Sequence, residues 1–195
     1  MSKAKVPNDD ERKRLAIVTG AGRHAKRNLA IIAVSYRLGL RAKEMAALRV
    51  DTVLGSRGEL LEECLLRSSM TKGGKERMAY LTNTGLRTAL KIYLDERRAE
   101  EGVCFNLKAP LFLSQRGDGF SPNTLQQLLH KLHSRAGIIG GRSHSGRRYL
   151  ATHLVAKGID LRSVQRILGH ASITTTAEYA EDNPIVLRRI IAEVA

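Results

Sequence analysis

Glycines divide the apolar periodicity of this chain into short helical stretches, and this punctuation constrains the fold more than any other feature. Gly39, Gly158 and Gly169 each follow a stretch in which aliphatic residues recur at helical spacing. Tryptophan is absent, and no apolar run is long enough to predict a membrane span. We therefore expect the aliphatic faces of short helices to build the core.

The predicted elements make a mainly α chain of the α+β class with a small antiparallel β-sheet. Helices are predicted over residues 8–19, 24–38, 42–48, 84–100, 121–136, 143–157, 161–168, 173–181 and 185–194. Strands are predicted over residues 50–54, 61–68 and 76–81, with an extended piece over 111–114. Asn8, Ser121 and Asp160 are the expected helix caps. One domain over residues 11–195 is expected after a tail of residues 1–10, with no separate N-terminal DNA-binding domain.

The core of these elements is predicted from the apolar stripes of the helices. The expected inward residues include Leu29, Ile32, Tyr36, Leu40, Met45, Leu48, Leu86, Leu90, Tyr93, Leu94, Leu125, Leu128, Leu129 and Leu132. Cys64 and Cys104 have no spacing typical of a metal site, so both are predicted to be buried thiols in a reducing compartment.

The formal net charge of +14 and the sequence pI near 10.3 indicate a polyanionic partner. Basic residues outnumber acidic ones over residues 1–50 and 101–150, whereas residues 151–195 are balanced. This uneven distribution favours nucleic acid over a charge that serves only solubility. A membrane surface is disfavoured because no basic amphipathic helix with large aromatic residues is present.

Two arginines and several histidines suit phosphoryl transfer, whose transition state gathers negative charge on phosphate oxygens. Arg41 and Arg147 are candidate phosphate ligands, although either could be a solvated surface charge. His144 lies three residues before Arg147, which predicts that both point from one face of a helix. His170 follows Gly169 at the expected start of the next helix, where backbone N–H groups favour anions.

A tyrosine is a candidate nucleophile, provided that cations or a base activate its phenol. Tyr36, Tyr80 and Tyr93 fall on apolar stripes and are predicted to be core. Tyr179 has polar neighbours near the chain end, and Tyr149 is its rival. The remaining candidate is a lysine in the glycine-rich turn between two strands, Lys72, which could protonate a leaving oxygen. No carboxylate cluster predicts a metal site, so chemistry without a metal is expected.

In order and spacing, these residues resemble the catalytic domain of the tyrosine recombinase (phage integrase) family. Gly-Leu-Arg41-x-x-Glu44 resembles the first arginine box, and Lys-Gly-Gly-Lys-Glu-Arg at 72–77 resembles the hairpin of the catalytic lysine. His144-x-x-Arg147 resembles the second box. Leu168-Gly169-His170, with Tyr179 nine residues on, resembles the third box and the nucleophile. The resemblance covers residues 10–195 and implies the fold shared with type IB topoisomerases.

The resemblance implies that Tyr179 attacks a scissile DNA phosphate, forms a 3′-phosphotyrosyl link and releases a 5′-hydroxyl. Lys72 would protonate the leaving oxygen, and no cofactor, ATP or metal is implied. The other implied roles are phosphate binding by Arg41 and Arg147, hydrogen bonding and proton movement by His144 and His170, and orientation by Glu44. Lys75 and Arg148 are the rivals of Lys72 and Arg147, and the family spacing favours the lower number in each pair.

The implied partners are double-stranded DNA, further copies of the chain in a tetrameric synapse, and an accessory DNA-binding protein. The chain resembles the short, catalytic-domain-only members such as fimbrial phase-variation invertases, although it could be an excised domain. A C-terminal stripe is expected to dock on a neighbouring copy or on its own core: Leu187, Ile190, Ile191 and Val194. Action on DNA implies a cytoplasmic, nucleoid-associated protein.

The favoured function is a site-specific DNA recombinase that integrates, excises or inverts a mobile element. A DNA-binding regulator that keeps the fold without the chemistry is an alternative, against which the complete residue set argues. A type IB topoisomerase-like relaxing enzyme is the other, and the Leu-Gly-His box and short length argue against it.

Overall fold

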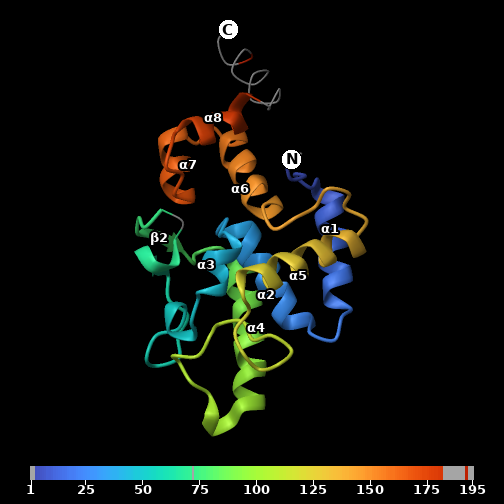
Figure 1. Cartoon of the computed structure of the whole chain (residues 1–195), viewed down its shortest axis with the longest axis vertical. Coiled ribbons are helices and arrows are strands. Elements are labelled where there is room, and N and C mark those ends of the chain that lie inside the picture. The colour runs from blue at the N-terminus through green and yellow to red at the C-terminus, as the bar shows by residue number, and fades with distance from the viewer. Residues whose placement is uncertain (1–2, 72, 182–191, 193–195) are drawn as a thin grey trace.

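The computed structural model describes residues 3–71, 73–181 and 192 (Figure 1). Its α-helices are α1 (Asp9–Gly20), α2 (Ala25–Arg37), α3 (Ala42–Ala46), α4 (Thr84–Glu101), α5 (Pro122–Arg135), α6 (Ser145–Ala156), α7 (Leu161–Leu168) and α8 (Thr174–Glu181). Its strands are β1 (Glu63–Leu66) and β2 (Arg77–Tyr80). The predicted mainly α fold with a small antiparallel sheet is confirmed. The helix predicted over residues 185–194 lies outside the described residues, except for residue 192.

Polar caps begin the helices where the sequence places them. The Asn8 side chain accepts a hydrogen bond from the Glu11 backbone N–H at 2.9 Å, and the Glu11 carboxylate accepts one from the Asn8 N–H. Ser121 accepts from the Thr124 N–H, and Asp160 accepts from the Ser163 N–H. These contacts satisfy donors that the first helical turn leaves without partners, so the predicted helix starts are confirmed.

The antiparallel sheet has two strands within the described residues, and the third predicted strand is wrong. β1 and β2 pair from Glu63 opposite Tyr80 to Leu66 opposite Arg77. Residues 50–52 instead form a 3₁₀ turn, whose Val50 N–H donates to the Ala109 carbonyl at 3.0 Å. The Ala109 carbonyl belongs to a loop far away in the sequence. The local apolar run therefore predicted an extended segment, but it could not predict that this loop accepts the backbone hydrogen bond.

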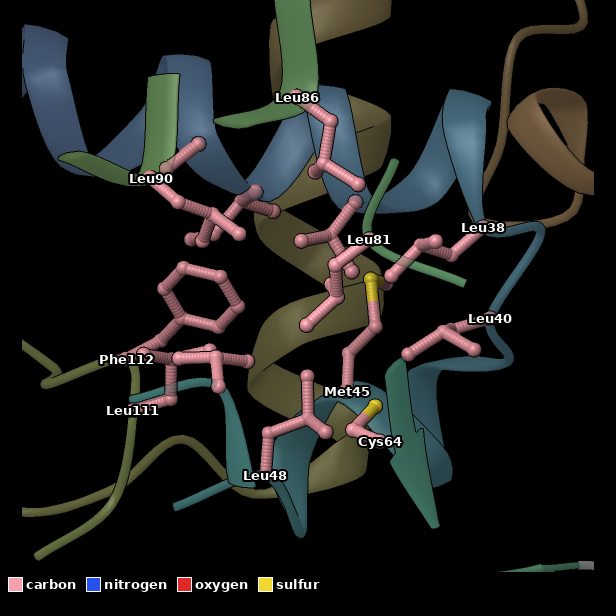
Figure 2. Packing of buried hydrophobic residues seen from close by; sticks show 14 of the residues in the cluster. Leu38, Leu40, Met45, Leu48, Cys64, Leu81, Leu86, Leu90, Leu111 and Phe112 are labelled. Carbon is pink, nitrogen blue, oxygen red and sulfur yellow. The ribbon is translucent and has the colours of Figure 1, made fainter. Parts of the chain in front are cut away.

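The main core lies where α2, α3, α4 and α5 meet the sheet (Figure 2). α4 presents Leu86, Leu90 and Leu94 toward α2, and each is at most 1% exposed. Met45 and Leu48 complete this layer below them. Most predicted inward residues are therefore confirmed, although Leu29, Ile32 and Leu128 are only half-buried. The hydrophobic effect holds α3 against α5 and α2.

Two predictions of burial are wrong. Tyr80 is 53% exposed because it lies on the opposite face of β2 from the buried Ala79, beside the open cleft described below. Cys104 is exposed in the short 3₁₀ turn after α4, whereas Cys64 is buried in the core as predicted.

α6, α7 and α8 pack together at one end of the molecule (Figure 1). Their small apolar cluster comprises Ala151, Val155, Val164 and Leu168, with Tyr179 against it. α7 also contacts β2, and α2 supports α6 from the main core. This arrangement brings the Leu168-Gly169-His170 motif close to the hairpin of β1 and β2 and to the start of α3. Among the described residues, no helix is both long and apolar enough to cross a membrane.

Candidate active site

The start of α3 holds Arg41 against a buried carboxylate. Gly39, with a φ of 61°, turns the chain so that Arg41 becomes the residue before the helix. The Glu44 carboxylate accepts hydrogen bonds from the Arg41 backbone N–H at 2.8 Å and from its guanidinium at 3.0 Å. Glu44 is fully buried, whereas the Arg41 side chain is 21% exposed. The carboxylate therefore orients a guanidinium that solvent or a ligand still reaches.

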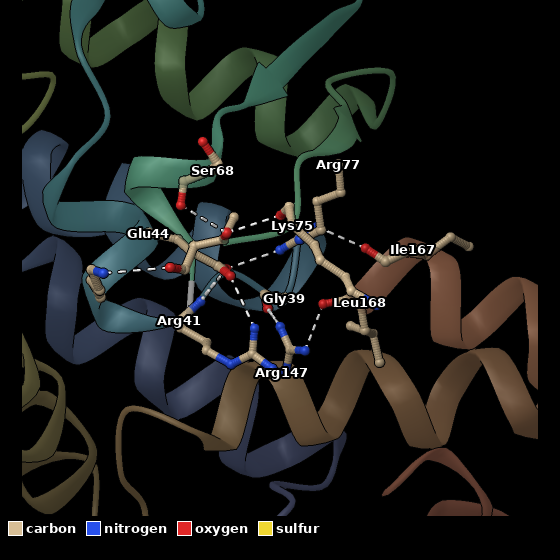
Figure 3. A network of polar contacts seen from close by, with 11 residues as sticks. Gly39, Arg41, Glu44, Ser68, Lys75, Arg77, Arg147, Ile167 and Leu168 are labelled. Carbon is tan, nitrogen blue, oxygen red and sulfur yellow. Dashed lines mark hydrogen bonds and ion pairs between the residues drawn. The ribbon is translucent and has the colours of Figure 1, made fainter. Parts of the chain in front are cut away.

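Arg77, at the start of β2, is a site residue that sequence reasoning missed. Its guanidinium donates to the Glu44 carboxylate at 2.9 Å and to the Ile167 carbonyl of α7 at 2.7 Å (Figure 3). Burial raises the pKa of Glu44, but the charges of Arg77, Arg147 and Arg41 and the bonded N–H outweigh it. The net effect is a lowered pKa, so Glu44 is ionised at neutral pH.

Arg147 lies in the first turn of α6 and is only 3% exposed. It donates to the Gly39 carbonyl at 2.8 Å and to the Leu168 carbonyl at 2.6 Å, so it joins the starts of α3 and α6 to the end of α7 (Figure 3). Burial and then the nearby charge of Arg41 lower its pKa to about 9. An anion placed here would relieve the crowding of positive charge.

His170 lies in the loop after α7, and its predicted place at a helix start is wrong. Gly169, with a φ of 65°, ends α7 in the left-handed conformation, and α8 begins only at Thr174. The His170 ring lies 2.9 Å from the Thr176 hydroxyl and is buried. Burial, followed by the charges of neighbouring arginines, lowers the His170 pKa to about 4. The ring is therefore neutral at pH 7.

Tyr179 of α8 lies beside this histidine in the same chain. The two rings stack with centroids 6.0 Å apart, and the Arg148 guanidinium lies 5.6 Å from the Tyr179 centroid. Its rival Tyr149 is 8% exposed and packs in another cluster, against Tyr36. The fold therefore brings Tyr179, and not Tyr149, to the arginine cluster.

The structure says less about the two remaining predicted site residues, His144 and Lys72. His144 is the exposed residue directly before α6; its backbone is already helical, and its carbonyl accepts from the Arg148 N–H at 2.9 Å, so a face shared with Arg147 stays a prediction. Lys72 lies outside the described residues. Its rival Lys75 is exposed, on a turn in which the Thr71 hydroxyl donates to the Lys75 carbonyl at 2.9 Å.

A cleft of about 750 Å³ opens beside Arg41 and His170, whereas Arg147, Tyr179 and His144 are not among the described residues that line it. Its lining residues include Arg41, Glu44, Lys75, Arg77, Arg162, Arg166 and His170. The guanidiniums of Arg41 and Arg77 meet the Glu44 carboxylate there. Basic side chains outnumber the two acidic ones in the lining, Glu44 and Glu76, so positive charge remains in excess. Such a cleft suits an anion with several oxygens, such as a phosphodiester. Among the described residues, no three His, Cys, Asp or Glu side chains lie close enough to hold a metal ion.

Comparisons with known proteins agree with this geometry. The family model described as "Phage integrase family" matches residues 8–184. Tyrosine recombinase XerC of Pelobacter propionicus is 34% identical over 154 residues, which cover 78% of this chain and 47% of the relative. Tyrosine recombinase XerD of Mycobacterium tuberculosis is 35% identical over 167 residues, which cover 85% of this chain and 51% of the relative. The chain thus spans about half the length of the curated relatives it matches.

Solved structures of recombinases share the fold. The crystal structure of XerA recombinase has a TM-score of 0.78 at 28% identity, covering 99% of this chain and 66% of that one. XerH site-specific recombinase, in a post-cleavage complex with palindromic difH substrate, has a TM-score of 0.71 at 25% identity. That match covers 96% of this chain and 53% of the XerH chain. The protein described here belongs to the phage integrase family of tyrosine recombinases.

Proposed function

We propose that this chain is the catalytic part of a site-specific DNA recombinase that cuts and rejoins strands through a 3′-phosphotyrosyl intermediate. The observation that carries the proposal is the position of Tyr179, stacked on His170 beside the buried Arg147 in one chain. A phenol needs nearby positive charge to attack as a phenolate, and this site supplies it. The same charge would stabilise the oxygens of the phosphate under attack.

In the proposed step, the Tyr179 hydroxyl gives its proton to the neutral His170 ring beside it, and its oxygen bonds to phosphorus while the bond from phosphorus to the 5′ oxygen breaks. The leaving oxygen takes up a proton, for which Lys72 is the proposed donor. The 5′-hydroxyl of another strand then attacks the phosphotyrosine and frees the tyrosine. Arg41 and Arg147 bind phosphate oxygens, whereas His144 and His170 donate hydrogen bonds or move protons. The adduct retains the bond energy, so rejoining proceeds without ATP.

The proposed partners are double-stranded DNA and further copies of the chain in a tetrameric synapse, with an accessory DNA-binding protein. Residues 11–195 form the proposed catalytic domain after a tail of residues 1–10, acting at the nucleoid. The C-terminal stripe of residues 185–194 is proposed to dock on a neighbouring copy. A chain truncated after Asn183 should then fold as a monomer but fail to recombine DNA, whereas misfolding would favour docking within one chain.

The test of the activity is covalent capture. Protein is incubated with supercoiled DNA from its own genetic neighbourhood and with nicked random-sequence duplexes, then denatured, and protein-linked DNA is sequenced. Wild type is expected to form an adduct that Tyr179→Phe abolishes and that Tyr149→Phe retains. DNA binding without an adduct would support a regulator. Relaxation of plasmids that lack any recombination site would support a topoisomerase-like enzyme.

A further inference from the structure

The Arg77 side chain joins three elements of the site. It leaves the start of β2 and reaches between α3 and α7, where one terminal nitrogen donates to Glu44 and the other to the Ile167 carbonyl (Figure 3). Only 7% of the side chain is exposed. The carbonyl belongs to the last turn of α7, whose C=O groups have no partner within the helix. Arg77 therefore provides a hydrogen-bond donor both to the Glu44 carboxylate and to a free carbonyl at the end of α7.

Charge sharing at Glu44 is the first consequence. A carboxylate paired only with Arg41 would neutralise the guanidinium that is proposed to hold the phosphate. Its oxygen Oε2 is instead shared with Arg77, at 2.9 Å. The Arg77 charge therefore offsets the carboxylate, and Arg41 keeps the positive charge that an anionic transition state needs.

Gly169 of the Leu168-Gly169-His170 motif leaves the space through which the Arg77 side chain passes. A Cβ atom at Gly169 would lie 2.5 Å from the Arg77 Cδ atom, closer than atoms can pack. The glycine before His170 thus makes room for the Arg77 stem as well as ending α7. Arg147 holds the next carbonyl, that of Leu168, so two arginines bind consecutive carbonyls of one helix end. The loop that carries His170 therefore begins at a helix end whose carbonyls are bound by both Arg77 and Arg147.

We infer that Arg77 is a positioning residue for strand cleavage, which sets Arg41 through Glu44 and the His170 loop through Ile167. The inference rests on the proposed function. Both terminal nitrogens of Arg77 already have protein partners, and its Nε atom is buried. Arg77 lines the cleft, but its terminal nitrogens are committed to Glu44 and Ile167, so its proposed action runs through these groups.

The first test compares Arg77→Met with Arg87→Met. Arg87 is a matched control, because it is half-buried and donates only to the carbonyls of Leu60, Leu61 and Leu81, away from the site. The measurement is the single-turnover rate of adduct formation on the captured duplex, with DNA affinity measured separately by anisotropy. Arg77→Met should lower the rate about 10-fold to 100-fold, as for small misplacements of catalytic groups, with DNA affinity little changed. Arg87→Met should retain the wild-type rate among folded molecules.

The second test separates the phosphate site from the proton donor. A duplex with sulfur in place of the scissile 5′ oxygen has a leaving group that needs no proton. The Arg77→Met defect should persist on this duplex, because Arg77 acts on the groups that bind the phosphate. Full restoration by sulfur would mean that Arg77 only places the hairpin lysine, and would overturn the inference.

Two further variants guard against misfolding. Arg77→Lys retains a cation but cannot make both contacts, so it should recover only part of the rate. Glu44→Gln combined with Arg77→Met removes the unpaired carboxylate, so adding Arg77→Met to Glu44→Gln should lower the rate less than Arg77→Met lowers the wild-type rate, because only the Ile167 contact is newly lost. Independent, multiplying defects would overturn the inference, as would a wild-type rate in Arg77→Met. A wild-type protein that forms no adduct would defeat the proposed function and the inference together.

Discussion

Tyr179 and His170 stack within one chain, with ring centroids 6.0 Å apart and planes inclined by 18°. The nucleophile proposed for strand cleavage thus lies beside the other groups of its own site before DNA is bound. Thr176, one α8 turn earlier, touches the same imidazole, so α8 carries both the tyrosine and a contact that places the histidine.

This arrangement predicts cleavage by each chain's own tyrosine. Mixing Arg147→Gln protein with Tyr179→Phe protein should give no adduct, because neither chain holds a complete site. The measurement is covalent capture on the selected duplex at several mixing ratios, with each variant alone as the control. Adduct formation in the mixture would instead require a tyrosine donated between chains.

The lowered pKa of His170 predicts a pH dependence of stability. An unfolded histidine titrates near 6.5, whereas His170 in the fold titrates at about 4, so the unfolded state binds more protons between these values. The stability contributed by the neutral ring is complete above about pH 6.5 and is lost as pH falls toward 4. His170→Gln should flatten this dependence, at about 1.4 kcal/mol per unit of pKa difference removed. Urea unfolding at pH 4.5 and 7.5 measures it.

The wild-type slope contains other histidines, so the difference between the two proteins is the informative quantity. His133 is fully buried and also has a lowered pKa through burial, and both proteins retain it. An NMR titration of the His170 ring should give a midpoint well below that of an exposed histidine. A midpoint near 6.5 would contradict the buried, cation-flanked position.

Removal of the Glu44 charge should expose the repulsion among the arginines. Glu44→Gln leaves Arg41, Arg77 and Arg147 without their shared carboxylate and should lower the free energy of unfolding by about 3 kcal/mol. Sodium sulfate should restore more stability to this variant than to wild type, because a dianion can replace the missing charge. Sodium chloride at equal ionic strength is the control, and equal effects of the two salts would argue against an anion site.

Gly169 and Gly158 form a matched pair for testing the third motif. Both have left-handed φ values, 65° and 79°, but a Cβ atom at Gly158 would meet nothing within 4 Å. Gly158→Ala should therefore lower the free energy of unfolding by about 1 kcal/mol, from backbone conformation alone. Gly169→Ala should lose more, because its Cβ meets the Arg77 side chain, and should also lose adduct formation. If the two variants lose the same free energy of unfolding, the contact of the added Cβ with Arg77 does not affect stability.

Local signals predicted most of the helices and the core. Caps such as Asn8 and Asp160 act within one turn, so their effect is visible in a short stretch of sequence. The apolar stripe of α4 likewise depends on residues three and four apart. The strand predicted at residues 50–54 failed because its hydrogen-bond partner lies near residue 109, a pairing that no local pattern contains.

The candidate site divides in the same way. Motif spacing named Arg41, Glu44, Arg147, His170 and Tyr179, and the fold brings these residues together. Their catalytic roles stay predictions. Arg77 stood in the quoted hairpin motif, but its contact with Ile167 spans 90 residues and only the folded chain reveals it. The exposure of Tyr80 escaped prediction because it depends on which face of β2 borders the open cleft, and this follows only from the tertiary arrangement.

The end of α7 gives the DNA-free site an internal counterion. Carbonyl oxygens of Ile167 and Leu168 carry the partial negative charge of a helix C-terminus, and they face the guanidiniums of Arg77 and Arg147. The arginines are therefore partly compensated before any phosphate arrives. A stray anion gains less from entering such a site than it would from an uncompensated one. Under the proposed function, a phosphate within duplex DNA would be held in addition by neighbouring phosphates that meet basic residues of the cleft such as Arg162 and Arg166. The two carbonyls would then favour polymeric DNA over free ions.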